Sequence, residues 1–457
     1  MVSRISLPRI SLSKYNLERI FEVIFLLLIP AGVFRVNLSF PGYESFFLFR
    51  ILLLGFYLFF TFTFIFKRAY FFKIFNHVKN LKLIVGFFLC WILWSLTSYF
   101  WVLDISNYFR YNVLLIISVG FLLSAILVVK NEKILKKILI VSLATFGIAL
   151  FVALLEIFFG FRLPGSKLLT EPERLQAFAT SFFSHPNDFA SYISLTLPFL
   201  VILPLLKNYK KYRILVSVLI IISMFALSFT GSKINFLATG FAGFIALAIF
   251  LREKKLSFSV LLITFIILIF SFQPSVGVTL RNYVAQVIDI EGLTPSDSLQ
   301  ASDINDITGQ IEGNYGSFEI RRNLVINGLD IIVKHPAPVI SVFSGVGAGQ
   351  AEVYIKNYDN TKDVLNLHNW WLEVFVNHGV VIFLVYLAAY FYLLKQVFQK
   401  VKSEKGNFLR YFGNSVLVIL AVFLLTSISP SSSVGYLPLW FTLGIAIAYI
   451  NIKTEKA

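Results

Sequence analysis

The sequence predicts an all-α protein of about twelve transmembrane helices with one large domain outside the membrane. Hydrophobic residues make up 58% of the 457 residues, and the mean hydropathy is +0.80. Charged residues make up only 14%. Soluble domains contain about 45–50% apolar and about 25% charged residues. A chain of this composition needs a bilayer, because it could not bury so many apolar side chains in an interior of its own.

Long apolar runs recur along the chain and define the predicted helices. A helix needs about 20 mostly apolar residues to cross a membrane. The runs that qualify are Ile20–Val36, Glu44–Phe66, Leu83–Val102, Asn112–Val129, Ile138–Gly160, Phe189–Leu206, Ile214–Phe229, Ile234–Leu251, Phe258–Phe272, Trp371–Leu394, Phe412–Ser429 and Val434–Ile450. No small-residue cleavage site follows the first run, so we expect it to be retained rather than removed as a signal peptide.

The basic residues predict the orientation of these helices. Most of the 40 Lys and Arg residues lie in short segments after every second run, such as 130–137, 207–213 and 395–410. Short basic loops stay in the cytoplasm. We therefore expect a multi-pass protein of the cytoplasmic (inner) membrane with both termini in the cytoplasm. The net charge of +16 is spread over these loops, so it does not indicate nucleic acid, which requires a continuous basic face.

One connection is much longer than the others and defines the predicted domains. These are residues 1–272 with nine helices and an outer loop at 161–188, an extracytoplasmic loop domain at 273–369, and residues 370–457 with three helices. Within the loop domain, apolar residues recur at helical spacing from Phe318 to Lys334. The single cysteine, Cys90, excludes an intrachain disulfide and a Cys-rich zinc site. We expect no cofactor.

The segment that opens the tenth helix could carry chemistry. His368 can act as a general base near neutral pH, and Glu373 follows it in the same helix. Alternatively, His368 and Asn369 cap the helix while Trp370 and Trp371 form an aromatic belt at the membrane surface. The residue types alone do not separate these two interpretations.

Basic residues on the outer side are candidates for holding an anion. Arg321 and Arg322 lie in the predicted helix of the loop domain, and arginine binds phosphate through two parallel hydrogen bonds. Adjacent residues point about 100° apart on a helix, so both are not expected to share one ligand. Lys233 begins the eighth helix after Thr230-Gly231-Ser232. The alternatives are a solvated helix face or lipid headgroup contact for the arginines, and a lysine that extends to the membrane surface.

The second outer loop adds weaker candidates. It contains Arg174, His185 and Asn187, which could contact a ligand. Asn187 and Asp188 could equally cap the sixth helix. The glycines of 345–349 resemble a nucleotide-binding turn, but no buried strand precedes them and they lie outside, so we exclude ATP there.

Several of these segments, in this order, resemble the O-antigen ligase/polymerase superfamily. The most specific is His368-Asn369 followed by Gly379 in front of a membrane helix. The segments Arg321-Arg322-Asn323-Leu324, Gly345-Val346-Gly347 and Val364–Trp371 look most like its Gram-positive teichuronic-acid polymerase branch. Ser184–Ala190 and Gly231-Ser232-Lys233 match further family segments. The chain departs from the pattern at Ile382, where a second glycine is common, and at Lys233, where many members have arginine.

The resemblance implies a GT-C-like fold and a metal-independent membrane glycosyltransferase that acts on saccharides linked to polyprenyl (undecaprenyl) diphosphate. It implies that Arg321 binds the diphosphate with Lys233 and Arg174 as helpers, and that His368 activates the acceptor hydroxyl. Substrate contacts are further expected from Arg322, Asn369, His185, Asn187 and Glu373. Membrane lipids and a chain-length regulator are expected partners.

Three functions remain open from the sequence. A polymerase would use another lipid-linked repeat unit as acceptor, whereas a ligase would pass finished glycan to a lipid, protein or wall acceptor. A transporter or flippase for lipid-linked saccharides is the third. Transporters usually show internal repeats and polar residues at the middle of the membrane. Neither is visible here, so the sequence favours transfer over transport.

Overall fold

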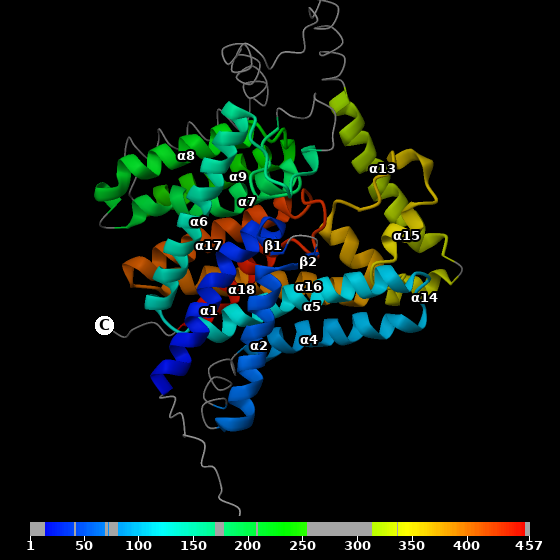
Figure 1. Ribbon diagram of the computed structural model, residues 1–457, viewed down its shortest axis with the longest axis horizontal. Coiled ribbons are helices and arrows are strands. Elements are labelled where there is room, and N and C mark those ends of the chain that lie inside the picture. Colours follow the sequence, from blue (N-terminus) through cyan, green and yellow to red (C-terminus); the bar gives the residue numbers. More distant parts are fainter. Residues whose placement is uncertain are drawn as a thin grey trace, which may run out of the picture.

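The computed structural model describes residues 14–40, 43–68, 72, 81–169, 178–206, 209–253, 313–335 and 337–452, and this part is almost entirely helical (Figure 1). Its helices are α1 Lys14–Phe34, α2 Leu48–Phe66, α4 Lys82–Thr97, α5 Ile105–Val128, α6 Glu132–Phe159, α7 Pro186–Val201, α8 Arg213–Ser228, α9 Lys233–Arg252, α13 Gly313–Val333, α14 Pro338–Ser344, α15 Ala351–Ile355, α16 Trp370–Ser403, α17 Asn407–Thr426 and α18 Leu437–Asn451. Short 3-10 turns join some of them, including η1 Arg35–Leu38. The described residues also contain one antiparallel hairpin, formed by β1 Ser39–Phe40 and β2 Tyr43–Phe47.

The predicted apolar runs correspond to these helices. Every run except Phe258–Phe272, which lies outside the described residues, coincides with a helix. By length and composition, 8 of the described helices can cross a membrane, and α8 and α18 are apolar but shorter. The second predicted run differs at its start, because residues 44–47 belong to β2 rather than to a helix. The protein is a polytopic α-helical membrane protein.

Local sequence signals explain several helix ends. Asp104 caps α5 by accepting a hydrogen bond from the amide of Asn107, and Asn131 caps α6 in the same way through Ile134. Such caps satisfy amides that have no partner within the helix. Gly160 ends α6 with a φ of +65°, a left-handed conformation that glycine adopts without strain.

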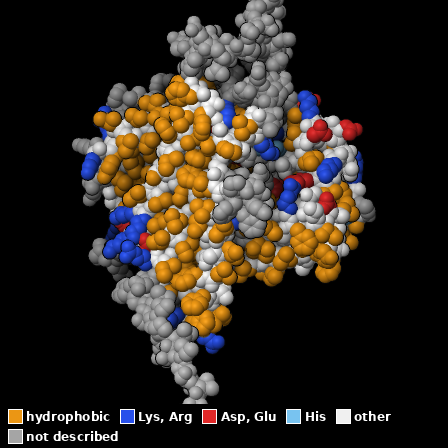
Figure 2. All heavy atoms as spheres, in the orientation of Figure 1, with side chains coloured by type: hydrophobic (Ala, Val, Ile, Leu, Met, Phe, Trp, Pro, Cys, Tyr) orange, Lys and Arg blue, Asp and Glu red, His pale blue; other side chains and the backbone are white. Residues whose placement is uncertain are grey.

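The packing separates a buried centre from an apolar periphery. α7, α17 and α18 are largely buried, and α17 packs against α7, α9 and α16. In contrast, α2 and α4 expose large apolar side chains such as Leu54, Leu58, Leu83 and Leu93. Figure 2 shows hydrophobic side chains covering a wide field of one face. A soluble protein rarely exposes a patch of this size, so these faces contact lipid.

A second, smaller hydrophobic cluster lies at one end of the molecule, where α13, α14 and α15 gather (Figure 1). It contains Leu324 and Ile331 of α13 and Ile355 of α15. Leu372 and Val376 of α16 complete it. This segment therefore packs its core against a membrane helix and does not form a separate globule. We call this end the α13 end.

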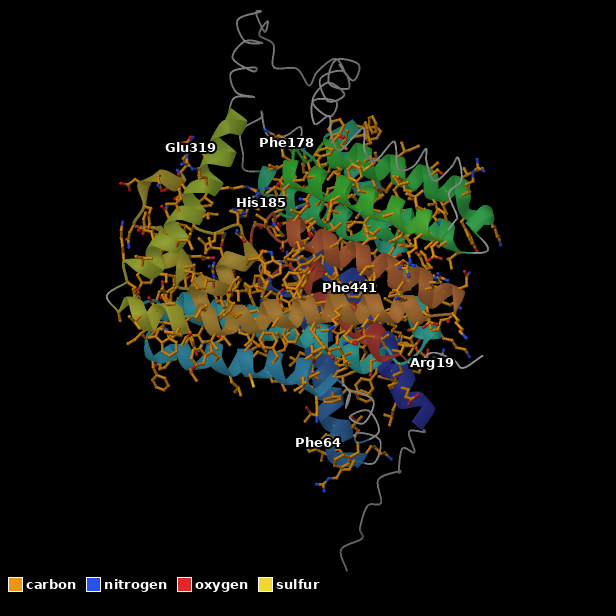
Figure 3. The ribbon with its side chains drawn as sticks, turned by 180° about the vertical axis from the view of Figure 1, so that it is seen from behind. Arg19, Phe64, Phe178, His185, Glu319 and Phe441 are labelled. Atoms are coloured by element: carbon orange, nitrogen blue, oxygen red, sulfur yellow. The ribbon has the colours of Figure 1, made fainter. Side chains whose placement is uncertain are left out.

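Charged pairs link helix ends on both sides of the molecule. At the α13 end, Arg110 of α5 pairs with Glu352 of α15. Other pairs are Glu18–Lys130 (3.5 Å), Glu22–Lys137 (2.5 Å) and Glu253–Arg410 (2.6 Å). Figure 3 shows Arg19, near the start of α1, on the other side of the molecule from Glu319 of α13. The helix bundle thus has an α13 end and an opposite end at which α1 begins.

Candidate active site

The loop between α17 and α18, residues 427–435, connects most of the candidate residues. Its sequence is rich in serine and includes Pro430 and Gly435, which prevent either helix from continuing. Carbonyl and hydroxyl groups of this loop contact residues at the start of α7, α9 and α16 and in α13. We call it the 427–435 loop. The candidate site therefore forms where four separate segments meet one loop.

His368 is bound to this loop by its side chain. Its Nδ1 lies 3.2 Å from the carbonyl oxygen of Pro430. A carbonyl can only accept, so Nδ1 carries the proton and Nε2 keeps its lone pair. Burial lowers the pKa of His368 to about 4, helped by the nearby charges of Arg321 and His185 and opposed by Asp188. The imidazole is therefore neutral at physiological pH, with its basic nitrogen available.

Arg321 reaches the same loop from α13. Its Nη1 donates to the carbonyl of Ile428 at 3.4 Å, and burial lowers the pKa of its guanidinium. The adjacent Arg322 is exposed. The two arginines thus point in different directions, as the helix geometry predicted. Arg321 and His368, 47 positions apart in the chain, contact carbonyls only two residues apart, so the structure brings these two predicted residues together.

The start of α7 reaches the loop through Asp188. The buried carboxylate of Asp188 accepts from the Ser431 amide at 2.8 Å and from the Ser431 hydroxyl. Tyr436 donates to the Asp188 carbonyl at 2.6 Å. The expectation that Asn187 and Asp188 cap this helix is wrong, because the N-cap is His185, which forms no side-chain cap hydrogen bond. Asp188 holds the loop instead, and His185 lies close enough for its charge to act on His368.

The start of α9 contacts the loop through Ser429. The Asn235 amide donates to the Ser429 hydroxyl at 2.7 Å, and the Ser232 hydroxyl lies 3.3 Å from the same oxygen. Lys233 follows Ser232 and is exposed. Gly231 turns the chain here with a φ of +64°. The predicted lysine therefore lies at the edge of the site, next to a residue that binds the loop.

The start of α16 has a structural role beside His368. Asn369 caps the helix by accepting from the Leu372 amide at 3.3 Å. The alternative of an aromatic belt is wrong for Trp370, which is buried and donates to the Tyr386 hydroxyl at 2.9 Å. Trp371 is also directed inward and donates to a backbone carbonyl of α17.

Glu373 faces away from the 427–435 loop. Its carboxylate pairs with the Tyr111 hydroxyl of α5, and Tyr111 also lies 3.3 Å from Nε2 of the buried His378. The structure thus places Glu373 in a neighbouring polar cluster and not with His368 and Arg321.

Glycines lock the α13 end against α16. Inside α16, Gly379 has φ +80° and ψ 175°, which kinks the helix. A Cβ on Gly379 would lie 2.1 Å from the Phe343 carbonyl oxygen, and one on Gly345 would lie 2.4 Å from the Asn377 backbone. The amides of Val346 and Gly347 donate to carbonyls of the kinked segment. These glycines therefore serve close backbone packing.

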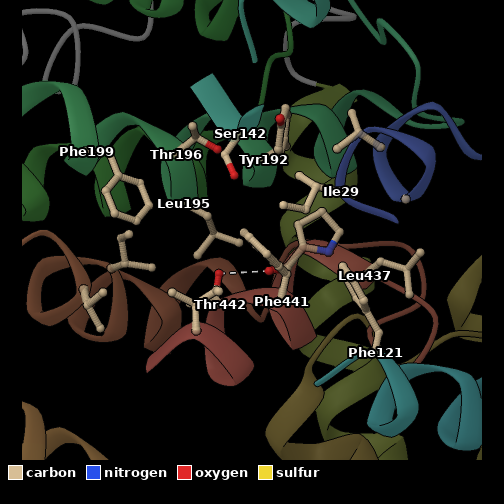
Figure 4. A pocket seen from close by; sticks show the side chains of 16 residues that line it. Ile29, Phe121, Ser142, Tyr192, Leu195, Thr196, Phe199, Leu437, Phe441 and Thr442 are labelled. Atoms are coloured by element: carbon tan, nitrogen blue, oxygen red, sulfur yellow. Dashed lines mark hydrogen bonds between the residues drawn. The ribbon is translucent and has the colours of Figure 1, made fainter. Parts of the chain in front are cut away.

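An apolar cavity lies apart from this cluster. It has a volume of about 50 Å³ and lies among α1, α6, α7, α17 and α18 (Figure 4). Its lining is almost entirely apolar, and it includes neither Arg321 nor His368. Arg174 lies outside the described residues. Among the residues that are described, no group of three His, Cys, Asp or Glu could hold a metal ion.

Sequence reasoning missed the 427–435 loop itself. It also missed Asn235 and the binding role of Asp188. A run of serines between two apolar helices was the only signal that could have indicated it. Glu156 of α6 was missed too, and it fixes the second outer loop by accepting from the Thr180 and Ser181 amides, both at 2.6 Å.

The arrangement offers a neutral base beside a buried cation. The free Nε2 of His368 can accept a proton, and the guanidinium of Arg321 can stabilise a negative charge close to it. Figure 3 shows His185 near the junction of α7 with the α13 end. Such a pair suits a reaction in which a hydroxyl attacks while an anionic group leaves.

Two comparisons relate the chain to known proteins. Residues 215–387 match the family model described as O-Antigen ligase. The chain is also 25% identical to the Teichuronic acid biosynthesis protein TuaE of Bacillus subtilis, over 447 residues that cover 95% of this chain and 85% of that protein. The family match spans Lys233, Arg321, His368 and Gly379. The resemblance inferred from the motifs is confirmed.

Proposed function

We propose that this membrane protein, whose residues 215–387 carry the O-antigen ligase match, is a glycosyltransferase of the outer face of the cytoplasmic membrane. It polymerises saccharide units that are linked to polyprenyl diphosphate, in the assembly of a teichuronic-acid-like polysaccharide. The observation that carries the proposal is the convergence of Arg321 and His368 on the 427–435 loop.

The proposed reaction transfers the donor sugar in one displacement at its anomeric carbon. The C1–O bond to the diphosphate breaks, and both its electrons leave with the polyprenyl diphosphate. An acceptor hydroxyl oxygen forms the new bond to C1, and its proton passes to Nε2 of His368. Arg321 holds the leaving diphosphate, and Lys233 adds a second positive charge at the edge of the site. The lipid-linked donor is already activated, so no nucleotide or metal enters this scheme.

The other predicted residues take supporting parts in the proposal. Arg174, in the second outer loop, would help Arg321 to hold the diphosphate. His185 and Asn187, at the start of α7, would contact the saccharide. Asn369 orients His368 by capping the next helix, and Glu373 acts through Tyr111 rather than on the substrate.

The proposed topology follows the charge distribution. Twelve helices, both termini in the cytoplasm, and the loop domain of 273–369 outside would put the α13 end at the outer surface. The basic residues of the opposite end, among them Lys130, Lys137 and Arg410, would then lie in the cytoplasm.

A ligase is the second candidate, and the description of the matching family favours it. It would use the same bond changes with a different acceptor, so the site alone does not separate the two. Gel profiles do: a strain without a polymerase accumulates single repeats, whereas a strain without a ligase accumulates polymer on its carrier. Precursor retained on the inner leaflet would indicate a flippase instead.

The test uses a strain that lacks the gene and expresses single variants. His368→Ala and Arg321→Ala should each reduce polymer at least about 100-fold, since a positioned general base contributes roughly 10²–10⁴-fold. Arg322→Ala is the matched control, because this adjacent arginine is exposed, and it should retain polymer. Membrane levels of all three proteins are measured by immunoblot. Normal long-chain polymer from His368→Ala or Arg321→Ala would remove the proposed site.

A further inference from the structure

A second group of positive charges lies beside the same loop and has no part in the mechanism above. Arg35 follows the last residue of α1 with a φ of +42°, an uncommon conformation for a residue other than glycine. Its Nη2 donates to the Gly435 carbonyl at 3.2 Å. Arg35 therefore touches the end of the 427–435 loop, whereas Arg321 and His368 contact its first half.

Arg35 is under-bonded for a half-buried guanidinium. Arginine has five N–H donors, and its buried Nε meets no acceptor among the described residues. It also forms no ion pair with any described carboxylate. Burial lowers the pKa of Arg35, and the more distant charge of Asp188 offsets this effect in part. Burying a charged donor without partners costs free energy, so the surroundings favour an added anion.

A second arginine is held beside Arg35. The end of α1 packs on the start of α2, where a Cβ on Gly32 would lie 3.3 Å from the Phe49 ring. Arg50 lies in the first turn of α2, with its guanidinium carbon 4.9 Å from the centre of the Phe47 ring. The two arginines are close enough for their positive charges to repel each other. An anion with more than one negative charge would attract both guanidinium groups and so offset this repulsion.

Asp188 is close to both positive groups. Its charge acts on His368 and on Arg35. Its carboxylate is already engaged by the Ser431 amide and hydroxyl. Along the loop sequence, Arg321 contacts Ile428, His368 contacts Pro430, Asp188 contacts Ser431 and Arg35 contacts Gly435. The carboxylate of Asp188 therefore binds the loop between the contacts of His368 and Arg35.

We infer that Arg35 and Arg50 form a second diphosphate site, which binds the diphosphate of a lipid-linked acceptor while Arg321 holds that of the donor. The inference rests on the proposed function and identifies its acceptor as a second lipid-linked saccharide. Both arginines lie next to ends of membrane helices, α1 and α2, where the diphosphate of a membrane lipid would be located. The acceptor's sugar would then extend toward His368, between the two sites.

Native mass spectrometry of the purified full-length protein tests the site without requiring activity. Undecaprenyl diphosphate is the probe, and phosphatidylglycerol is the competing source of lipid phosphate. Wild-type protein should bind two molecules of undecaprenyl diphosphate. Arg35→Gln and Arg50→Gln should each weaken one of the two binding events by roughly tenfold or more, as expected when hydrogen bonds to a charged group are lost.

Matched variants keep the test decisive. Arg110→Gln removes an exposed arginine at the α13 end, one that pairs with Glu352, and this variant should still bind two molecules. Arg35→Lys keeps the charge and should restore most of the lost affinity, because it is the positive charge that attracts the diphosphate. The inference is overturned if wild-type protein binds only one molecule of undecaprenyl diphosphate. It is also overturned if both glutamine variants bind two molecules as tightly as wild type. Equal displacement of the second molecule by phosphatidylglycerol overturns it too, because this would assign the site to ordinary lipid headgroups.

Activity separates this inference from the proposed function. With a lipid-linked acceptor, Arg35→Gln should raise the half-saturating acceptor concentration about tenfold. With the same saccharide free of lipid and diphosphate, it should leave the rate unchanged. An equal loss of transfer rate with both acceptors would refute the second diphosphate site but leave the proposed glycosyltransferase function standing. No transfer by wild type with either acceptor would instead refute the proposed function.

Discussion

Replacing Gly379 by alanine should disrupt the junction between α16 and the α13 end. Gly379 has φ +80° and ψ 175°, a region of backbone conformation that is essentially restricted to glycine. A Cβ here would lie 2.1 Å from the Phe343 carbonyl oxygen, 2.4 Å from its carbon and 2.6 Å from the Gly345 nitrogen. All three atoms belong to the backbone, so no side-chain rotation can relieve the overlap.

The expected loss follows from two effects. Holding alanine in this conformation costs about 1–3 kcal/mol. Forcing extra volume into a closely packed contact costs about 1–3 kcal/mol more. The total of about 2–6 kcal/mol is a large part of the roughly 5–15 kcal/mol that stabilises a typical folded protein. The segment between Gly379 and His368 would shift as well, so transfer should fail even where the protein remains folded.

This loss of stability is measured by heating the detergent-purified protein and monitoring the folded fraction by size-exclusion chromatography. Gly147→Ala is the control: Gly147 lies inside α6, no neighbouring atom is within 4 Å of the position that a Cβ would occupy, and alanine is the better helix former. We expect a clearly lower midpoint for Gly379→Ala and no decrease for Gly147→Ala. Equal midpoints for the two variants would refute the reasoning from backbone overlap.

Three further predictions concern charge. The acidic limb of the pH–rate profile should lie near pH 4, well below the ordinary value for histidine, because burial keeps His368 neutral down to that pH; initial rates across pH measure it. Glu156→Ala should destabilise the protein by about 3–5 kcal/mol, since it leaves the buried Arg162 without its carboxylate partner at 3.4 Å, and a lower thermal midpoint would report this. Lys233→Gln should weaken donor binding roughly 10–100-fold, whereas Lys233→Arg should retain binding, as measured by donor titration.

Each of these predictions has a contrary outcome. A limb near the ordinary pKa of histidine would mean that His368 is more solvated than the structure indicates, or that another base acts. An equal decrease of the thermal midpoint in Glu156→Ala and in an exposed control such as Lys136→Ala would argue against a specific role of the Glu156 carboxylate. Donor binding unchanged in Lys233→Gln would remove Lys233 from the donor site.

The sequence predicted the helices well because hydropathy is a local property. Each apolar run reports its own burial in lipid, whatever the neighbouring helices do. The hairpin of β1 and β2 was missed because Phe46 and Phe47 lead directly into the apolar α2, so no turn signal separates the strand from the helix. The end of α16 was also missed: this helix extends to Ser403, beyond the predicted Leu394, since its polar last turns continue past the apolar run.

The site was predictable only where side chains carry the contact. His368 and Arg321 stand out as ionisable groups beside membrane helices. Their common partner does not, because they bind the carbonyls of Pro430 and Ile428, and every residue has a carbonyl. The serines of the loop could have indicated a polar segment between two helices, but not which side chains bind its carbonyls.

The 427–435 loop also explains why the candidate base has a fixed position. His368 has a φ of +48°, a strained conformation that must be imposed by its surroundings. The loop imposes it on two sides, since the Trp370 amide donates to the Ser427 carbonyl at 3.1 Å while the imidazole binds that of Pro430. The loop is held in turn by Asp188 and Asn235, from two different helices. The orientation of one imidazole thus depends on contacts that the loop makes with α7, α9 and α16. A substitution that removes one of these contacts should lower the rate of transfer even where the protein remains folded.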